Sequence, residues 1–198
     1  MKKSFPIVTI VVSGVSIFCS LIVFLNPELF STLCFRTRPE HVWQYVSGSF
    51  IHVIEPRFAF WIQLIMNCMG LIPMGILVEK EYGSLRIGIL MLSEMIVSAI
   101  VFQLVTWNYS GEAAGISAIM YAVGTVGFYV LFKRLKSERK AFWKKFSSFY
   151  FTFIGLGMVT NIAPMMSIVS LVMHLSGILV GVGFITLDRF VWKKDTQY

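Results

Sequence analysis

The chain alternates long apolar runs with short polar connections, and this pattern predicts its elements. A helix of about 20 apolar residues crosses the ~30 Å hydrocarbon core of a bilayer. Runs of that kind, free of Lys, Arg and Asp, occupy residues 6–25, 59–78, 87–107, 114–132, 147–163 and 166–187. The connections are too short for a soluble domain, so we expect residues 1–198 to form a single all-α membrane protein domain, a bundle of six transmembrane helices.

Composition supports this class. Hydrophobic residues make up 57% of the chain and charged residues only 14%, well below the ~25% of a soluble domain. The first run is too long for a signal peptide and no small-residue cleavage site follows it, so we expect a retained helix. The cysteines are odd in number and show no disulfide or metal spacing, which favours small buried side chains: Cys19, Cys34 and Cys68.

The charges are distributed asymmetrically about these runs. If the N-terminus lies inside, every one of the 17 Lys and Arg residues is inside except Arg36, Arg38 and Arg57. This positive-inside bias predicts that both termini are cytoplasmic, and the six-helix plan favours a bacterial cytoplasmic membrane. The basic loop "KRLKSERKAFWKK" is typical of an anchor on anionic headgroups of the lipid bilayer. No nucleic acid partner is expected.

Polar side chains in three of the runs fall at one depth. Counted from the cytoplasmic ends at ~1.5 Å per residue, Ser117 lies ~22 Å and His174 ~20 Å up. Asn67 lies at ~17 Å and Gln63 at ~23 Å on the same scale. Polar groups inside a bilayer are costly and are functional candidates, although each of these also fits a structural role in helix packing or hydrogen bonding between helices.

Small residues accompany this layer. Gly177 and Gly181 form a small-xxx-small face just below His174, and Ala118 and Ala122 lie in the run that carries Ser117. Such faces allow two helix backbones to approach closely in lipid. We therefore expect the fourth and sixth runs to pack against each other.

The residue inventory limits the chemistry. Glu94 lies ~10 Å below the serine layer, so a hydrolytic centre would be a Ser–His dyad without a carboxylate. An H-E-x-x-H zinc motif is missing, and we expect no metal and no cofactor. Asp188 and Asp195 are both at the cytoplasmic end and no lysine lies within a run, which excludes aspartyl and Ser–Lys proteolysis. Two possibilities remain: hydrolysis by a serine nucleophile, or a protein without catalytic activity.

Several stretches together carry a family pattern. They are "GISA" at 115–118, "HLSGILVG" at 174–181, "QLIMN" at 63–67, "MGILVEKEYGS" before residue 85 and "HVWQYVSGSFIH" at 41–52. Taken in turn, they resemble the G-x-S-G, His-and-glycine, H-x-x-x-N, G-x-x-x-E-x-x-x-G-S and aromatic loop segments of the rhomboid intramembrane serine proteases. Their order along the chain and the runs on which they lie also agree with that family. The resemblance covers nearly all of the six-helix core.

The resemblance implies a role for each candidate. Ser117 would attack the scissile carbonyl and His174 would transfer the proton. The Ser117 backbone N–H and Asn67 would donate hydrogen bonds to the oxyanion, with Gln63 in the position of the family's histidine. The supporting residues would be Gly115, for the entry into the fourth helix, Tyr121, packed against the histidine, and Gly177 and Gly181.

Two positions depart from the family pattern, Gln63 in place of histidine and Ala118 in place of glycine. Either change would lower activity or narrow specificity. The expected function is an intramembrane serine endopeptidase that cuts transmembrane protein substrates near the outer face. The alternative is a catalytically inactive rhomboid-like protein that binds membrane clients; a small transporter is less favoured, because the runs show no inverted repeat.

Overall fold

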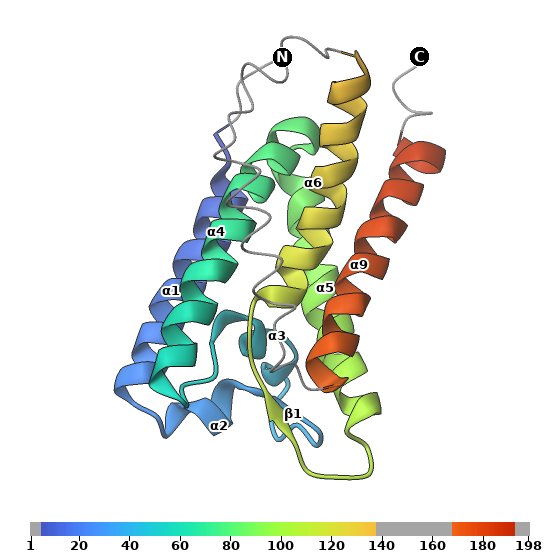
Figure 1. The fold of residues 1–198 in the computed structure, drawn as a ribbon. Helices are drawn as coiled ribbons and strands as arrows, with labels where there is room; N and C mark the ends of the chain where they lie inside the picture. The colour runs from blue at the N-terminus through green and yellow to red at the C-terminus, as the bar shows by residue number, and fades with distance from the viewer. Residues whose placement is uncertain (1–4, 138–167, 193–198) are drawn as a thin grey trace.

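The computed structural model describes residues 5–137 and 168–192. Within these residues, five long helices run roughly side by side (Figure 1). They are α1 (Ile7–Leu25), α4 (Arg57–Tyr82), α5 (Ser84–Val105), α6 (Ser117–Ser137) and α9 (Ile168–Leu187), the last continued by a short π-helical segment, η2 (Asp188–Trp192).

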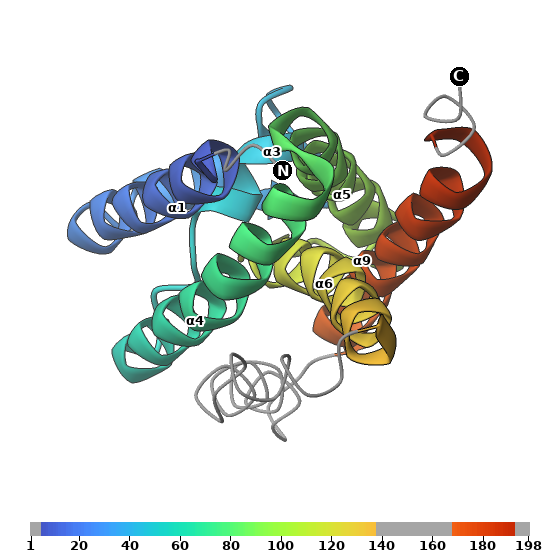
Figure 2. The same ribbon diagram turned by 90° about the horizontal axis from the view of Figure 1, so that it is seen from above.

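Helix α6 lies at the centre of this arrangement (Figure 2). It packs against α4, α5 and α9, while α1 packs on α4. Among the described residues, four segments are long and apolar enough to cross a membrane, namely α1, α4, α5 and Ile168–Phe190. Helix α6 does not meet that criterion, because its last turns carry Lys133, Arg134 and Lys136 and lower its mean hydropathy. The expected count of six helices is not confirmed, and the predicted run 147–163 lies outside the described residues.

The fourth apolar run was expected from about residue 114, and the helix begins three residues later, at Ser117. Residues 112–113, just before the run, form a strand, β2 (Glu112–Ala113). This strand pairs antiparallel with β1 (Phe35–Arg36), with Phe35 opposite Ala113. A hydropathy pattern predicts a helix for the uncharged stretch "AAGIS". Its first residue, Ala113, instead pairs with Phe35, which lies far away in the sequence.

The long connection between α1 and α4 is partly helical. It contains α2 (Leu29–Leu33), β1, α3 (Gln44–Ser47) and the 3-10 turn η1 (Gly48–Phe50). The buried Gln44 amide ties this connection together, since it donates to the Ser31 and Thr32 carbonyls and accepts from the Glu40 and His41 N–H groups. These elements and β2 lie at one end of the bundle, here called the ribbon end (lower in Figure 1).

Glu79 fastens three helices at the opposite end. Its fully buried carboxylate accepts hydrogen bonds from the N–H groups of Val8 and Thr9, both at 2.9 Å, and from the Thr9 hydroxyl at 2.7 Å. The Ser84 hydroxyl donates to it at 2.7 Å. A carboxylate satisfies the unpaired N–H groups of a helix N-terminus and is favoured there by the helix dipole. Glu79 of α4 thus caps α1 and holds the start of α5.

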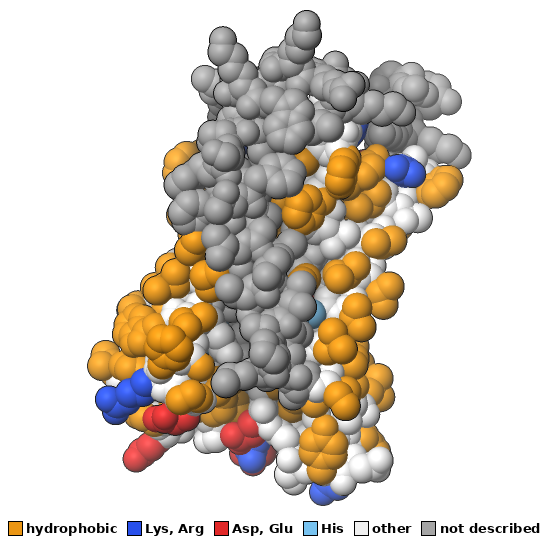
Figure 3. Space-filling view, viewed as in Figure 1, with side chains coloured by type: hydrophobic (Ala, Val, Ile, Leu, Met, Phe, Trp, Pro, Cys, Tyr) orange, Lys and Arg blue, Asp and Glu red, His pale blue; other side chains and the backbone are white. Residues whose placement is uncertain are grey.

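The sides of the bundle are apolar. Phe18 is 64% exposed, Leu104 67% and Leu179 70%, far more than a soluble protein would leave to water at many sites at once. Hydrophobic side chains cover the flank of the molecule, and the charged ones gather towards its two ends (Figure 3). This distribution and the spanning helices identify an integral membrane protein with several transmembrane passes.

The three cysteines are free, as their spacing predicted. Cys34 is buried near the ribbon end, while Cys19 and Cys68 are half-buried in α1 and α4.

Candidate active site

Ser117 and His174 meet between α6 and α9. The distance from His174 Nε2 to Ser117 Oγ is 2.8 Å, a hydrogen bond between residues 57 positions apart. His174 is buried, and its Nδ1 atom has no hydrogen-bond partner among the described residues. Among the described residues no carboxylate contacts this side of the ring, so the pair has the geometry of a dyad.

The imidazole is held by stacking and by close helix packing. The Tyr121 ring stacks on the His174 ring, with 4.5 Å between centroids and 28° between planes. One turn further along α9, a Cβ atom on Gly177 would collide with the Ala118 carbonyl oxygen. A Cβ atom on Gly181 would lie 2.7 Å from the Ala122 carbonyl oxygen. The small residues predicted for this contact let the two backbones approach until the side chains touch.

The backbone that leads to Ser117 is strained and anchored. Gly115 has φ +142°, a conformation that side chains rarely adopt. Its N–H donates to the Gly48 carbonyl at 2.9 Å, which fixes the end of β2 against η1. Ser117 then opens α6, where the first backbone N–H groups of a helix have no intrahelical partner and point toward an incoming anion.

Asn67 lies at the level of Ser117. Helices α4 and α6 run in the same direction from the ribbon end (Figure 1), and Gly70 of α4 contacts the Met120 side chain of α6. Asn67 and Ser117 each precede this contact by three residues, about 4.5 Å along their helices. The depth predicted from residue counting thus agrees with the packing register.

Asn67 also takes part in a buried polar chain that the sequence did not indicate. Its Nδ2 atom lies 2.9 Å from Nε2 of His52, and Nδ1 of His52 lies 2.8 Å from the Ser20 hydroxyl in α1. Burial lowers the pKa of His52 to about 4, so its ring is neutral at neutral pH. His52 precedes α4 in the chain and connects α1 with the side chain of Asn67.

The other candidates take no part in the hydrogen bond between Ser117 and His174. Gln63 is half-buried in α4 and makes no hydrogen bond within the described part of the chain. Ala118 is 3% exposed, so its methyl group packs inside the bundle. Glu94 is fully buried and accepts hydrogen bonds from Ser98 at 2.6 Å and Ser176 at 3.1 Å, which joins α5 to α9.

Comparison with known families decides the identity. A model of the rhomboid domain matches residues 39–189, well over half of the chain. The chain belongs to the rhomboid family. Rhomboid proteins are a family of intramembrane proteases that act on membrane proteins within the bilayer. No curated protein matches the sequence.

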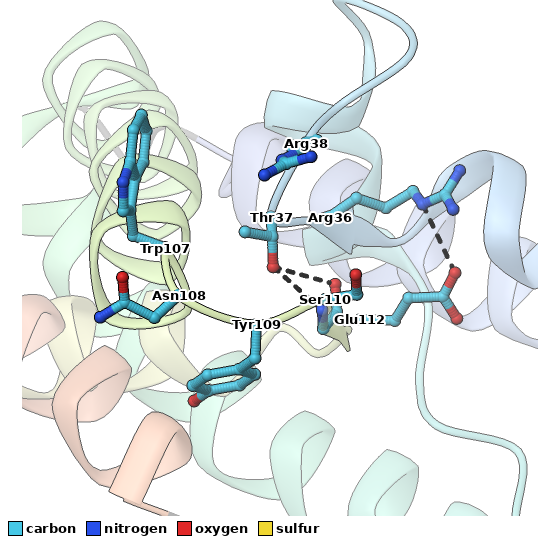
Figure 4. Close-up of a pocket in the computed structure, with 9 residues that line it drawn as sticks. Arg36, Thr37, Arg38, Trp107, Asn108, Tyr109, Ser110 and Glu112 are labelled. Atoms are coloured by element: carbon cyan, nitrogen blue, oxygen red, sulfur yellow. Dashed lines mark hydrogen bonds and ion pairs between the residues drawn. The ribbon is translucent and has the colours of Figure 1, made fainter.

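In this rhomboid protein a separate pocket of about 500 Å³ opens at the ribbon end (Figure 4). Its cationic side is made by Arg36 and Arg38, of which Arg36 is ion-paired with Glu40 and, at 3.5 Å, with Glu112. The remaining lining residues are polar and aromatic: Thr37, Trp107, Asn108, Tyr109, Ser110 and Gly111. The strand β2 begins at the lining residue Glu112, and the chain continues from it to Ser117.

Three residues that contact the candidate site were not predicted from the sequence: Ser20, Gly48 and His52. Gly48 and Ser20 act through backbone and hydroxyl groups that no spacing indicates. A signal for His52 was present, because it is a single ionisable residue within the apolar stretch "SFIHVI". A histidine in such a stretch is buried and needs hydrogen-bond partners.

Proposed function

We propose that the chain is a serine endopeptidase that hydrolyses peptide bonds in or near the transmembrane segments of membrane-protein substrates. Ser117 is the nucleophile and His174 the general base. The observation that carries the proposal is the 2.8 Å contact between His174 Nε2 and Ser117 Oγ, in a membrane-embedded helix pair. A nucleophile and base within hydrogen-bond reach are the signature of covalent catalysis.

The reaction follows from this geometry in two steps. Ser117 Oγ attacks the scissile carbonyl carbon while its proton moves to His174 Nε2, and the tetrahedral oxyanion receives hydrogen bonds from the Ser117 N–H and the Asn67 amide. His174 then protonates the leaving amine, which departs and leaves an acyl-enzyme. Water enters, gives its proton to His174 and hydrolyses the ester, which restores Ser117.

The site's height in the bundle supports cleavage near the outer face. Ser117 opens α6 at the ribbon end, and the positive-inside charge bias assigns that end to the outside, with both termini in the cytoplasm. Attacking water reaches a site at this level through the polar loops of the ribbon end rather than through the apolar flank. We assign the protein to a bacterial cytoplasmic membrane, with single-span membrane proteins as substrates.

Cleavage of a fluorogenic transmembrane peptide in proteoliposomes tests the proposal. The wild type is expected to cut it, while Ser117→Ala and His174→Ala each reduce the rate by at least 1,000-fold. The matched control is Ser110→Ala, which removes a hydroxyl from the separate pocket and should leave the rate unchanged. A substrate cut equally well by Ser117→Ala would refute the assignment.

The alternative is a rhomboid protein that binds membrane clients without cutting them. The observation in its favour is Gln63, which stands where the family has a histidine and makes no hydrogen bond within the described residues. This alternative predicts that the wild type binds a client but leaves both the peptide and a serine-directed probe unreacted.

A further inference from the structure

A polar chain buried beside the site links α1 to α4. Ser20, His52 and Asn67 are 0%, 0% and 2% exposed, and they follow one another at 2.8 Å and 2.9 Å. A buried polar group is costly unless it is hydrogen-bonded, and His52 uses both of its ring nitrogens in this chain. The proposed reaction itself uses neither Ser20 nor His52.

The hydrogen-bond partners of Ser20, His52 and Asn67 fix which atom donates in each hydrogen bond of this polar chain. The Ser20 hydroxyl donates its single proton to the Phe50 carbonyl oxygen, 3.2 Å away, so its oxygen accepts from the N–H at Nδ1 of His52. The neutral ring then carries a lone pair on Nε2, which accepts a hydrogen from the Asn67 amide nitrogen. The opposite tautomer would set two N–H groups against each other.

This arrangement determines which way the Asn67 amide faces. An isolated amide can rotate by half a turn and exchange its oxygen and nitrogen, and only the nitrogen can donate to an oxyanion. His52 accepts from the nitrogen and would repel the oxygen, because the oxygen and the ring Nε2 both carry lone pairs. One of the two amide hydrogens is used by His52, and the same nitrogen carries the second.

The segment that bears His52 also holds the nucleophile's loop. Four residues earlier, the Gly48 carbonyl accepts the N–H of Gly115, two residues before Ser117. Residues 48–52 therefore contact both the entry to α6 and the Asn67 side chain of α4. A displacement of this segment would move the nucleophile and the oxyanion donor together.

We propose that His52 is a positioning residue, which holds the Asn67 amide with its nitrogen toward the substrate so that it can donate to the oxyanion. Ser20 holds the ring of His52 in turn. The inference rests on the proposed protease function. His52 acts only through Asn67 and does not touch the substrate, so its removal should affect the transition state and not the binding of substrate.

A double-mutant cycle in proteoliposomes tests this inference with the fluorogenic transmembrane peptide. The variants are His52→Leu, Asn67→Ala and the double variant, with kcat and KM measured separately. His52→Leu is expected to lower kcat about 10-fold and Asn67→Ala about 100-fold, each with KM within 2-fold of the wild type. The double variant should match Asn67→Ala, because nothing remains for His52 to orient.

Two further variants separate positioning from folding. His41→Leu is the matched control, since this exposed histidine of the same connection stacks on Trp43, and its kcat should not change. Ser20→Ala keeps the His52 ring but removes its anchor, and it should lower kcat about 3-fold in the wild type and not at all in the Asn67→Ala background. This second cycle decides the question if His52→Leu does not fold.

The outcomes distinguish a failure of this inference from a failure of the proposed protease function. Losses that multiply in the double variants, or a His52→Leu variant with unchanged kcat, overturn the positioning role while the protease assignment stands. A wild type that neither cuts the peptide nor reacts with a serine-directed probe overturns both.

Discussion

The contact between α6 and α9 offers a sharp test of how the site is assembled. Gly177 lies one turn below His174 on α9, and a methyl group there would press on the Ala118 carbonyl oxygen and lie 3.2 Å from Tyr121 Cβ. Both neighbours belong to α6, and the carbonyl is backbone that cannot rotate away. Gly177→Ala therefore has to separate the two helices at the level of the site.

The size of the effect follows from these distances. Restoring an ordinary contact requires a shift of about 1 Å, and a misplacement of that size at a reacting centre costs roughly 100-fold in rate. The hydrogen bond from Ser117 to His174 would lengthen beyond the usual range at the same time. We expect kcat for the transmembrane peptide to fall about 100-fold in Gly177→Ala, with KM little changed.

The matched control is Gly183→Ala on the same helix. No atom lies within 4 Å of a Cβ built on Gly183, so this change adds only the preference of alanine over glycine for helix. Its kcat should stay within 2-fold of the wild type. A Gly177→Ala variant that cleaves as fast as Gly183→Ala would show that close packing of α9 on α6 does not set the geometry of the pair.

Two further predictions concern stability. Glu79→Gln should lower the free energy of unfolding by about 3 kcal/mol, because it replaces the carboxylate that accepts the N–H groups at the start of α1. Glu81→Gln removes two partly exposed ion pairs, with Lys133 and Arg134, and should cost less than about 1 kcal/mol. Thermal unfolding in detergent followed by circular dichroism checks this, and equal losses would contradict the capping role. Burial lowers the pKa of His52 from 6.5 to about 4, so the unfolded chain binds a proton at this site that the folded chain rejects. His52 alone should therefore lower the free energy of unfolding by up to about 3 kcal/mol as pH falls from 6.5 to 4, and should contribute no slope above 6.5. His52→Gln should lose less over the same window in the same assay, and an unchanged slope would contradict a neutral, buried His52.

The sequence predicted the parts of the site that depend on helix geometry. Ser117, Tyr121 and His174 lie on long helices with a fixed rise, so counting residues placed serine and histidine at one depth, and small residues indicated which helices pack. Asn67 followed from the same count. The depths needed only the rise of single helices, whereas the place of Tyr121 against the histidine was implied by the family resemblance.

Other parts depend on contacts between distant segments, and the sequence pattern does not contain them. The start of α6 is set by pairing of β2 with β1, two residues on each side, which leaves no alternation to detect. His52 lies in an irregular segment with no periodicity, so its partners in α1 and α4 could not be deduced. The half-buried Gln63, expected to assist Asn67, makes no hydrogen bond in the described part of the chain, and the neighbour of Asn67 is instead His52.

The most direct measurement of the central claim is the position of a fluorophosphonate adduct in native membranes, located by mass spectrometry. Only a serine activated by a neighbouring base reacts readily with this probe. The account predicts a single adduct on Ser117 in the wild type and none in His174→Ala, at equal amounts of folded protein. An adduct on a different serine, or equal labelling of Ser117 without His174, would contradict it.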